Sequence, residues 1–166
     1  MYPMTITPGS IVVGTTIQTA TVDQITLFAL QRKAPVSRIE IDRVCELCRW
    51  LDIDAAFVFA VWQHEQGIPL GNSLIGSLTH NPFNIKAYGR WPSVPAKGAK
   101  WNVYESWQLG LFAAVMHLKQ FYGANKLQSI GEIIPMFAPK SDKNDPASYI
   151  RFVCDCMNQI ATLPDR

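Results

Sequence analysis

The sequence has little net charge and no long hydrophobic run. Fifteen Lys and Arg residues stand against 13 Asp and Glu residues, which leaves a formal charge of +2. A surplus this small gives no basis for predicting a nucleic-acid partner. The apolar run 55–62 is too short to cross a bilayer, and polar, charged or turn-forming residues interrupt every stretch of about 18 residues. We therefore expect neither nucleic-acid binding nor a membrane span.

Several chemical motifs are also lacking. His64 is followed by Glu65 but not by the second histidine of a metalloprotease helix. The chain has no glycine-rich phosphate loop and no spaced nucleophile signature. Residues 1–10 lack the basic and apolar regions of a secretory signal, and the localisation stays open. The sequence disfavours a zinc or nucleotide enzyme and predicts no cofactor and no metal site.

The four cysteines leave three interpretations open. Cys45 and Cys48 are three residues apart on a predicted helix and share a face. Cys154 and Cys156 are two residues apart, about 200° around a helix, so both cannot easily point at one ion. Reduced, buried thiols are the first interpretation, with a disulfide between the two helices or a metal site as alternatives.

The composition predicts one folded domain. Of the 166 residues, 48% are hydrophobic and 17% are charged, which is enough apolar surface for one core. We expect a mostly helical α+β domain over residues 37–166. Residues 1–36 hold seven threonines and few strong helix formers. They predict an N-terminal arm or a poorly ordered leader, with a short helix near Val22–Gln31.

Local start signals predict five helices. Two are capping boxes, in which a serine and a glutamate three residues later satisfy N–H groups of the first turn. The others are single N-caps, one of them followed by proline. The predicted starts are Ser37, Asp54, Ser106, Ser129 and Asp145, and the first four helices end near Leu51, near Gln66, at Tyr122 and before Pro139. The helix after Asp54 is apolar on every side, which predicts a central, buried helix.

Residues 68–103 alternate four glycines with four prolines, which predicts loops and short strands rather than helix. A long irregular segment inside a compact domain is usually functional. Its aromatic residues Tyr88, Trp91 and Trp101 are too many to bury there, so we expect a contact surface. From Lys86 to Lys126 there are six Lys or Arg residues and one carboxylate. This indicates a solvated basic surface or, alternatively, an anionic polymer as partner.

Glu65 is the first candidate for chemistry, because it closes the apolar helix beside Trp62. Desolvation and the partial negative charge of a helix C-terminus both disfavour an anion. Both effects would therefore favour the protonated carboxyl that a general acid needs. The alternative is an exposed glutamate at a helix end.

Four segments between residues 50 and 155 resemble the lysozyme-like superfamily, and within it the glucosaminidase-type or phage-type peptidoglycan hydrolases. Residues 51–67 end in Glu-Gln-Gly, similar to the Glu-Ser-Gly end of the family's catalytic helix. Asn81-Pro-Phe-Asn-Ile-Lys86 resembles the motif Asn-Leu-Phe-Gly-Ile-Lys. Trp101-Asn-Val-Tyr-Glu-Ser106 is similar to an aromatic-x-x-Tyr-x-Ser segment, and residues 129–150 look like the family's tail. Gln66, Pro82 and Asn84 depart from these patterns.

The resemblance implies a lysozyme-like fold, with a small irregular or β-containing lobe after the catalytic helix. It also implies cleavage of the β-1,4-linked glycan strand of peptidoglycan, with Glu65 as general acid. The substrate-binding residues would be Asn81, Asn84, Tyr88, Trp91, Trp101, Tyr104 and Tyr149. Tyr149 would reach the site near Glu65, or else pack on the core.

The second catalytic group stays open. Glu105 is the only acidic side chain between Glu65 and Glu132, although it holds a variable position of its motif. Asp145 is the next candidate, but it is better explained as an N-cap. Otherwise a water held by Asn81 or Tyr149, or an intramolecular attack as in lytic transglycosylases, would serve.

We therefore expect a monomeric glycoside hydrolase of the glucosaminidase or muramidase type that acts on cell walls, with a lytic transglycosylase still open. The alternative from another class is a non-catalytic cell-wall-binding or virion structural module with the same fold. The departures at Gln66, Pro82 and Asn84 keep this alternative open.

Overall fold

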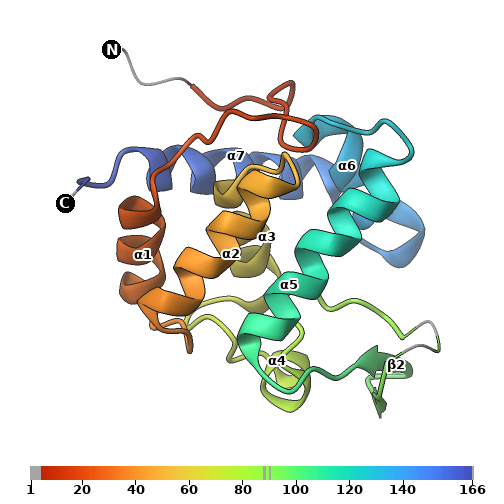
Figure 1. Cartoon of the computed structure of the whole chain (residues 1–166). Coiled ribbons are helices and arrows are strands. Elements are labelled where there is room, and N and C mark those ends of the chain that lie inside the picture. The colour runs from red at the N-terminus through yellow and green to blue at the C-terminus, as the bar shows by residue number, and fades with distance from the viewer. Residues whose placement is uncertain (1–4, 88, 90, 166) are drawn as a thin grey trace.

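The computed structural model describes residues 5–87, 89 and 91–165. These residues form a mostly helical structure with one small antiparallel hairpin, in agreement with the predicted α+β class (Figure 1). The elements are α1 (Val22–Gln31), α2 (Arg38–Trp50), α3 (Ala55–Gln66), α4 (Leu74–Thr79), β1 (Ser93–Ala96), β2 (Ala99–Asn102), α5 (Trp107–His117), the π-helical turn η1 (Leu118–Gly123), α6 (Ile130–Phe137), the 3₁₀ turn η2 (Lys140–Asp142) and α7 (Pro146–Ala161).

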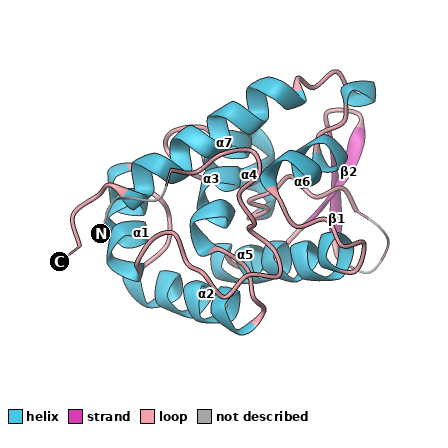
Figure 2. Cartoon of the chain, turned by 90° about the horizontal axis from the view of Figure 1, so that it is seen from above, coloured by secondary structure: helices cyan, strands magenta, loops and turns pink. Residues whose placement is uncertain are grey.

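Helix α3 is the centre of the core. The Asp54 carboxylate caps it by accepting the Ala56 N–H at 3.0 Å, and every side chain from residue 55 to 62 is at most 1% exposed. Helices α1, α2, α5 and α7 pack against it, and it lies between α7 and the α2–α5 pair (Figure 2). The apolar sequence of α3 is explained by this burial on all sides. Only its last turn, which carries Glu65, reaches the surface.

The residues before Ser37 pack into the same core. Residues 5–21 form an extended arm across one side of the molecule, and helix α1 follows at the predicted position (Figure 1). The Val12 N–H donates to Gln128 O at 2.8 Å and the Gly14 N–H donates to Asp52 O at 2.7 Å. Val12 is fully buried and belongs to the same hydrophobic cluster as α3. Described residues before Ser37 therefore contribute to the same core as the domain expected over residues 37–166.

The predicted helix starts are observed. Ser37, Asp54, Ser106, Ser129 and Asp145 are the N-caps of α2, α3, α5, α6 and α7. The helix predicted from Ser106 to Tyr122 differs in detail, because α5 ends at His117 and the π-helical turn η1 continues the chain to Gly123.

Residues 68–103 contain a helix that the sequence did not predict. In α4 the Ser73 hydroxyl accepts the Gly76 N–H at 2.9 Å, and the Thr79 hydroxyl donates to Ile75 O at 2.6 Å. The expectation of loops and strands alone was wrong here, because a Ser cap and tertiary packing outweigh the helix penalty of Gly76. The expected strands are β1 and β2, with Val94 opposite Trp101, at one end of the molecule (Figures 1 and 2).

The four cysteines are free and buried, which is the first of the three interpretations. Burial raises the pKa of the Cys45 and Cys156 thiols to about 12, so both stay uncharged at neutral pH.

In the part of the chain that the structure describes, no helix has both the length and the apolar character that a bilayer span needs.

Candidate active site around Glu65

Glu65 lies in the last turn of α3, where the buried helix emerges from the core. Its side chain is 17% exposed, so the carboxyl is largely enclosed but can still be reached from solvent. Gly67 ends the helix with φ +72°, a conformation that glycine adopts without strain. The chain thus places one carboxyl at the point where the apolar core meets the surface.

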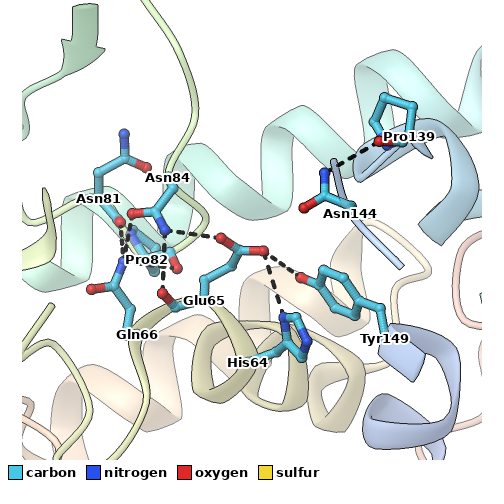
Figure 3. A network of polar contacts seen from close by, with 9 residues as sticks. All are labelled: His64, Glu65, Gln66, Asn81, Pro82, Asn84, Pro139, Asn144 and Tyr149. Carbon is cyan, nitrogen blue, oxygen red and sulfur yellow. Dashed lines mark hydrogen bonds and ion pairs between the residues drawn. The ribbon is translucent and has the colours of Figure 1, made fainter. Parts of the chain in front are cut away.

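Both oxygens of the Glu65 carboxyl accept hydrogen bonds (Figure 3). The Tyr149 hydroxyl donates to Oε1 at 2.6 Å, and the Asn84 amide donates to Oε2 at 2.9 Å. The Asn84 amide also donates to the backbone oxygen of Glu65 at 3.2 Å. His64 Nδ1 lies 3.9 Å from Oε1. Two donors from distant segments therefore hold a carboxyl that the end of α3 presents.

Tyr149 reaches Glu65 from the first turn of α7. It is 3% exposed, and its ring stacks on His64 with the centroids 3.4 Å apart. The Phe137 ring packs nearly perpendicular to the same ring. Burial, followed by the charge and hydrogen bond of Glu65, holds the pKa of Tyr149 well above its ordinary value. Tyr149 therefore remains a phenol, able to donate to Glu65, across the neutral pH range. The expectation that Tyr149 lies near Glu65 agrees with this geometry, and so does its alternative, packing on the core.

Asn84 belongs to a tight turn that brings its amide to Glu65. Its φ is +49°, in the left-handed region that asparagine tolerates better than most residues. The Gln66 amide nitrogen donates to Asn84 Oδ1 at 2.9 Å, and the Ser73 hydroxyl donates to Gln66 Oε1. Gln66 is 4% exposed and was not among the predicted site residues. The sequence feature that could have indicated Gln66 is its position in the resembled Glu-Ser-Gly motif, where glutamine replaces serine.

Asn81 holds the same turn from inside. It is fully buried; its amide nitrogen donates to Ile85 O and Asn102 O, and its amide oxygen accepts the Ile85 N–H at 2.9 Å. The nitrogen and the oxygen of its side-chain amide are therefore both bonded to the backbone. This geometry gives Asn81 a structural role in the turn, and the substrate contact that its motif position implied stays a prediction.

The predicted aromatic residues fall into different environments. Trp91 is 56% exposed and packs edge-on against Tyr104, which is itself buried. Trp101 is half-buried on β2, and its indole N–H donates to Ala96 O at 2.8 Å. More than half of the Trp91 surface is therefore open to solvent, whereas Tyr104 and Trp101 also stabilise the hairpin region. Tyr88 lies outside the described residues.

The two candidate second carboxylates lie apart from these contacts. Glu105 is exposed between β2 and the Ser106 cap, and none of the hydrogen bonds or ion pairs of Glu65 among the described residues involves it. Asp145 is an N-cap, and its carboxylate accepts the N–H groups of Ala147 and Ser148. The partners that the structure gives Glu65 are thus an amide, a phenol and an imidazole.

The described residues contain no group of three or more His, Cys, Asp and Glu side chains arranged to hold a metal ion.

The chain matches no family model, no curated protein and no solved structure.

Proposed function

We propose that this chain cleaves the β-1,4 glycan strand of peptidoglycan, that it has a lysozyme-like fold, and that Glu65 is its general acid. The observation that carries the proposal is the arrangement of Glu65 itself. Its carboxyl is 17% exposed at the end of a buried helix, with Asn84 and Tyr149 bonded to its two oxygens. Enclosure with a path to solvent is what a carboxyl needs to exchange a proton with a bound substrate.

The chemistry follows from that position. Protonated Glu65 gives its proton to the glycosidic oxygen, the bond between C1 and that oxygen breaks, and C1 takes on positive charge. The oxygen that then bonds to C1 comes from water in a hydrolase, or from a hydroxyl of the same sugar in a transglycosylase. In either case the O–H bond of that group breaks and its proton goes to the Glu65 carboxylate. Glu105 makes no hydrogen bond or ion pair with Glu65 among the described residues, but paired glycosidase carboxyls lie about 5–9.5 Å apart, so this alone does not remove it from the reaction. We propose a reaction that needs no second carboxyl, and substitution of Glu105 tests this.

The hairpin region supplies features suited to a glycan partner. Sugars present apolar C–H faces that stack on aromatic rings, and the Trp91 ring is more than half exposed. Lys97 and Lys100 on the same hairpin are exposed, and their charge suits a wall polymer that carries carboxylates. We propose that Trp91 contacts the glycan and that these lysines favour the anionic wall.

Purified peptidoglycan sacculi test the proposal. Activity should appear as a cleared band on a cell-wall zymogram, and mass spectrometry of the released fragments should show which glycosidic bond is cut. New reducing ends indicate a hydrolase, whereas anhydro ends indicate a transglycosylase. Binding to sacculi without any released fragment would reject the enzyme and favour the non-catalytic wall-binding module.

A further inference from the structure

Two departures from the resembled motifs are in contact with each other. Gln66 stands where the pattern has serine, and Asn84 stands where it has glycine. The Gln66 amide nitrogen donates to Asn84 Oδ1 at 2.9 Å, and Asn84 donates in turn to Glu65 (Figure 3). The two changes therefore form one connection that leads from the interior to Glu65.

The orientation of the Gln66 amide is fixed by its surroundings. Its nitrogen also faces the backbone oxygens of Asn81, at 2.9 Å, and Pro82, at 3.4 Å, and these can only accept. Its oxygen accepts from the Ser73 hydroxyl. A rotated amide would turn its oxygen toward three other oxygens, and Gln66 is only 4% exposed. That arrangement would leave buried polar groups unpaired, which is costly.

The fixed Gln66 amide determines the orientation of Asn84. Asn84 Oδ1 must accept from Gln66, so the Asn84 NH2 group must face Glu65. Glu65 Oε2 therefore meets an N–H donor and can only accept. A proton on Oε2 would point at that N–H group. Tyr149, beside Oε1, carries a hydroxyl that can both donate and accept.

We propose that Gln66 and Asn84 are positioning residues that confine the acid proton of Glu65 to Oε1, the oxygen next to Tyr149. This rests on the proposed function, in which Glu65 is the general acid, and it places the leaving oxygen of the substrate on the Tyr149 side of the carboxyl. The titratable groups seen to face the carboxyl are His64, on α3, and Tyr149, on α7.

The test is a pH titration of the Glu65 carboxyl carbon by 13C NMR, assigned with Glu65→Gln. Asn84→Gly removes the donor at a residue whose φ of +49° suits glycine. Loss of a donor to the carboxylate should raise the titration midpoint. Asn84→Asp keeps the shape, sets a second carboxylate against Oε2, and should raise the midpoint further.

Gln66→Met preserves volume but cannot orient Asn84, so it should also raise the midpoint. It should add nothing in the Asn84→Gly background, because the proposal has Gln66 act through Asn84. Asn144→Asp is the charge control, since Asn144 is exposed and bonds to Pro139 O. Its midpoint should stay close to that of the parent chain.

An unchanged midpoint in both Asn84 variants would overturn the proposal, and so would a full Gln66→Met shift in the Asn84→Gly background. The titration needs no wall activity, so the two proposals can fail separately. If the midpoints move as expected but sacculi stay intact, the proposed function fails and the positioning contact stands. If sacculi are cleaved but the midpoints do not move, only the positioning role is rejected.

Discussion

Replacing the buried cap Asp54 with asparagine should stabilise the fold above pH 6 but not near pH 4. Asp54 is 0% exposed, and its carboxylate accepts the N–H groups of Ala56 at 3.0 Å and Thr19 at 3.3 Å. Burial outweighs these hydrogen bonds and raises the pKa of Asp54 from 3.8 to about 6. The cap of the central helix is therefore a carboxyl that the folded state prefers to keep protonated.

The sign of the effect follows from proton linkage. Between pH 3.8 and about 6 the folded state holds a proton on Asp54 that the unfolded chain has released. The free energy of unfolding therefore falls as pH rises through this window and is flat above it. A pKa raised by about two units corresponds to roughly 3 kcal/mol. The Asp54→Asn variant would avoid this cost but lose the Thr19 bond, worth about 1 kcal/mol. The net gain near pH 8 is then about 2 kcal/mol, or about 4–8 °C in the thermal midpoint.

Urea unfolding of the parent chain and Asp54→Asn at several pH values between 3.5 and 8 measures this directly. Near pH 4 the Asp54→Asn protein should be about 1 kcal/mol less stable than the parent chain, because only the lost Thr19 bond counts there, and the difference should move in its favour up to pH 6. Asp52→Asn is the matched control, because the Asp52 side chain is 46% exposed and lies two residues away. A difference that does not depend on pH, or an Asp54→Asn protein less stable at pH 8, would refute the reasoning.

Three further predictions concern the candidate site. Tyr149→Phe removes the donor to Glu65 Oε1 and should lower wall cleavage about ten- to a hundredfold with the fold intact; parental activity would contradict this. Trp91→Ala should weaken chitooligosaccharide binding about tenfold in calorimetry and leave the thermal midpoint unchanged. Trp101→Ala breaks the bond to Ala96 O, so it should weaken binding and also lower the thermal midpoint. Unchanged affinity in both variants would place the sugar site elsewhere. Glu105→Gln should leave wall cleavage near the parental rate, and a loss equal to that of Glu65→Gln would make Glu105 a second catalytic carboxyl.

The helix starts were predictable because they depend on local chemistry. Ser37 bonds to the Glu40 N–H, and Asp145 bonds to the N–H groups of Ala147 and Ser148. Each such contact spans two or three residues, so spacing in the sequence reveals it. Helix α4 escaped prediction because it is six residues long and contains Gly76. Packing explains that glycine, since a Cβ there would meet the Gln66 amide oxygen at 1.9 Å.

The candidate site was predictable only in part. The position of Glu65 at the end of an apolar helix is a sequence feature, but the Tyr149 hydroxyl that bonds to it lies 84 residues along the chain. No periodicity links such residues, and only the resemblance pointed to Tyr149. The roles of Asn81 and Gln66 depend on which backbone groups a buried turn leaves unpaired. These unpaired groups can be identified only from the three-dimensional structure of the turn.

The central claim is tested most directly by the rate at which Glu65→Gln releases fragments from purified sacculi, measured beside the parent chain and Glu105→Gln. The substituted amide fits the same contacts, because its oxygen can accept from Asn84 and its nitrogen can donate to the Tyr149 hydroxyl. The fold should therefore be kept, with the thermal midpoint unchanged or raised. We predict that fragment release falls at least about a hundredfold in Glu65→Gln and stays near the parental rate in Glu105→Gln. Parental cleavage by a folded Glu65→Gln protein would contradict the account.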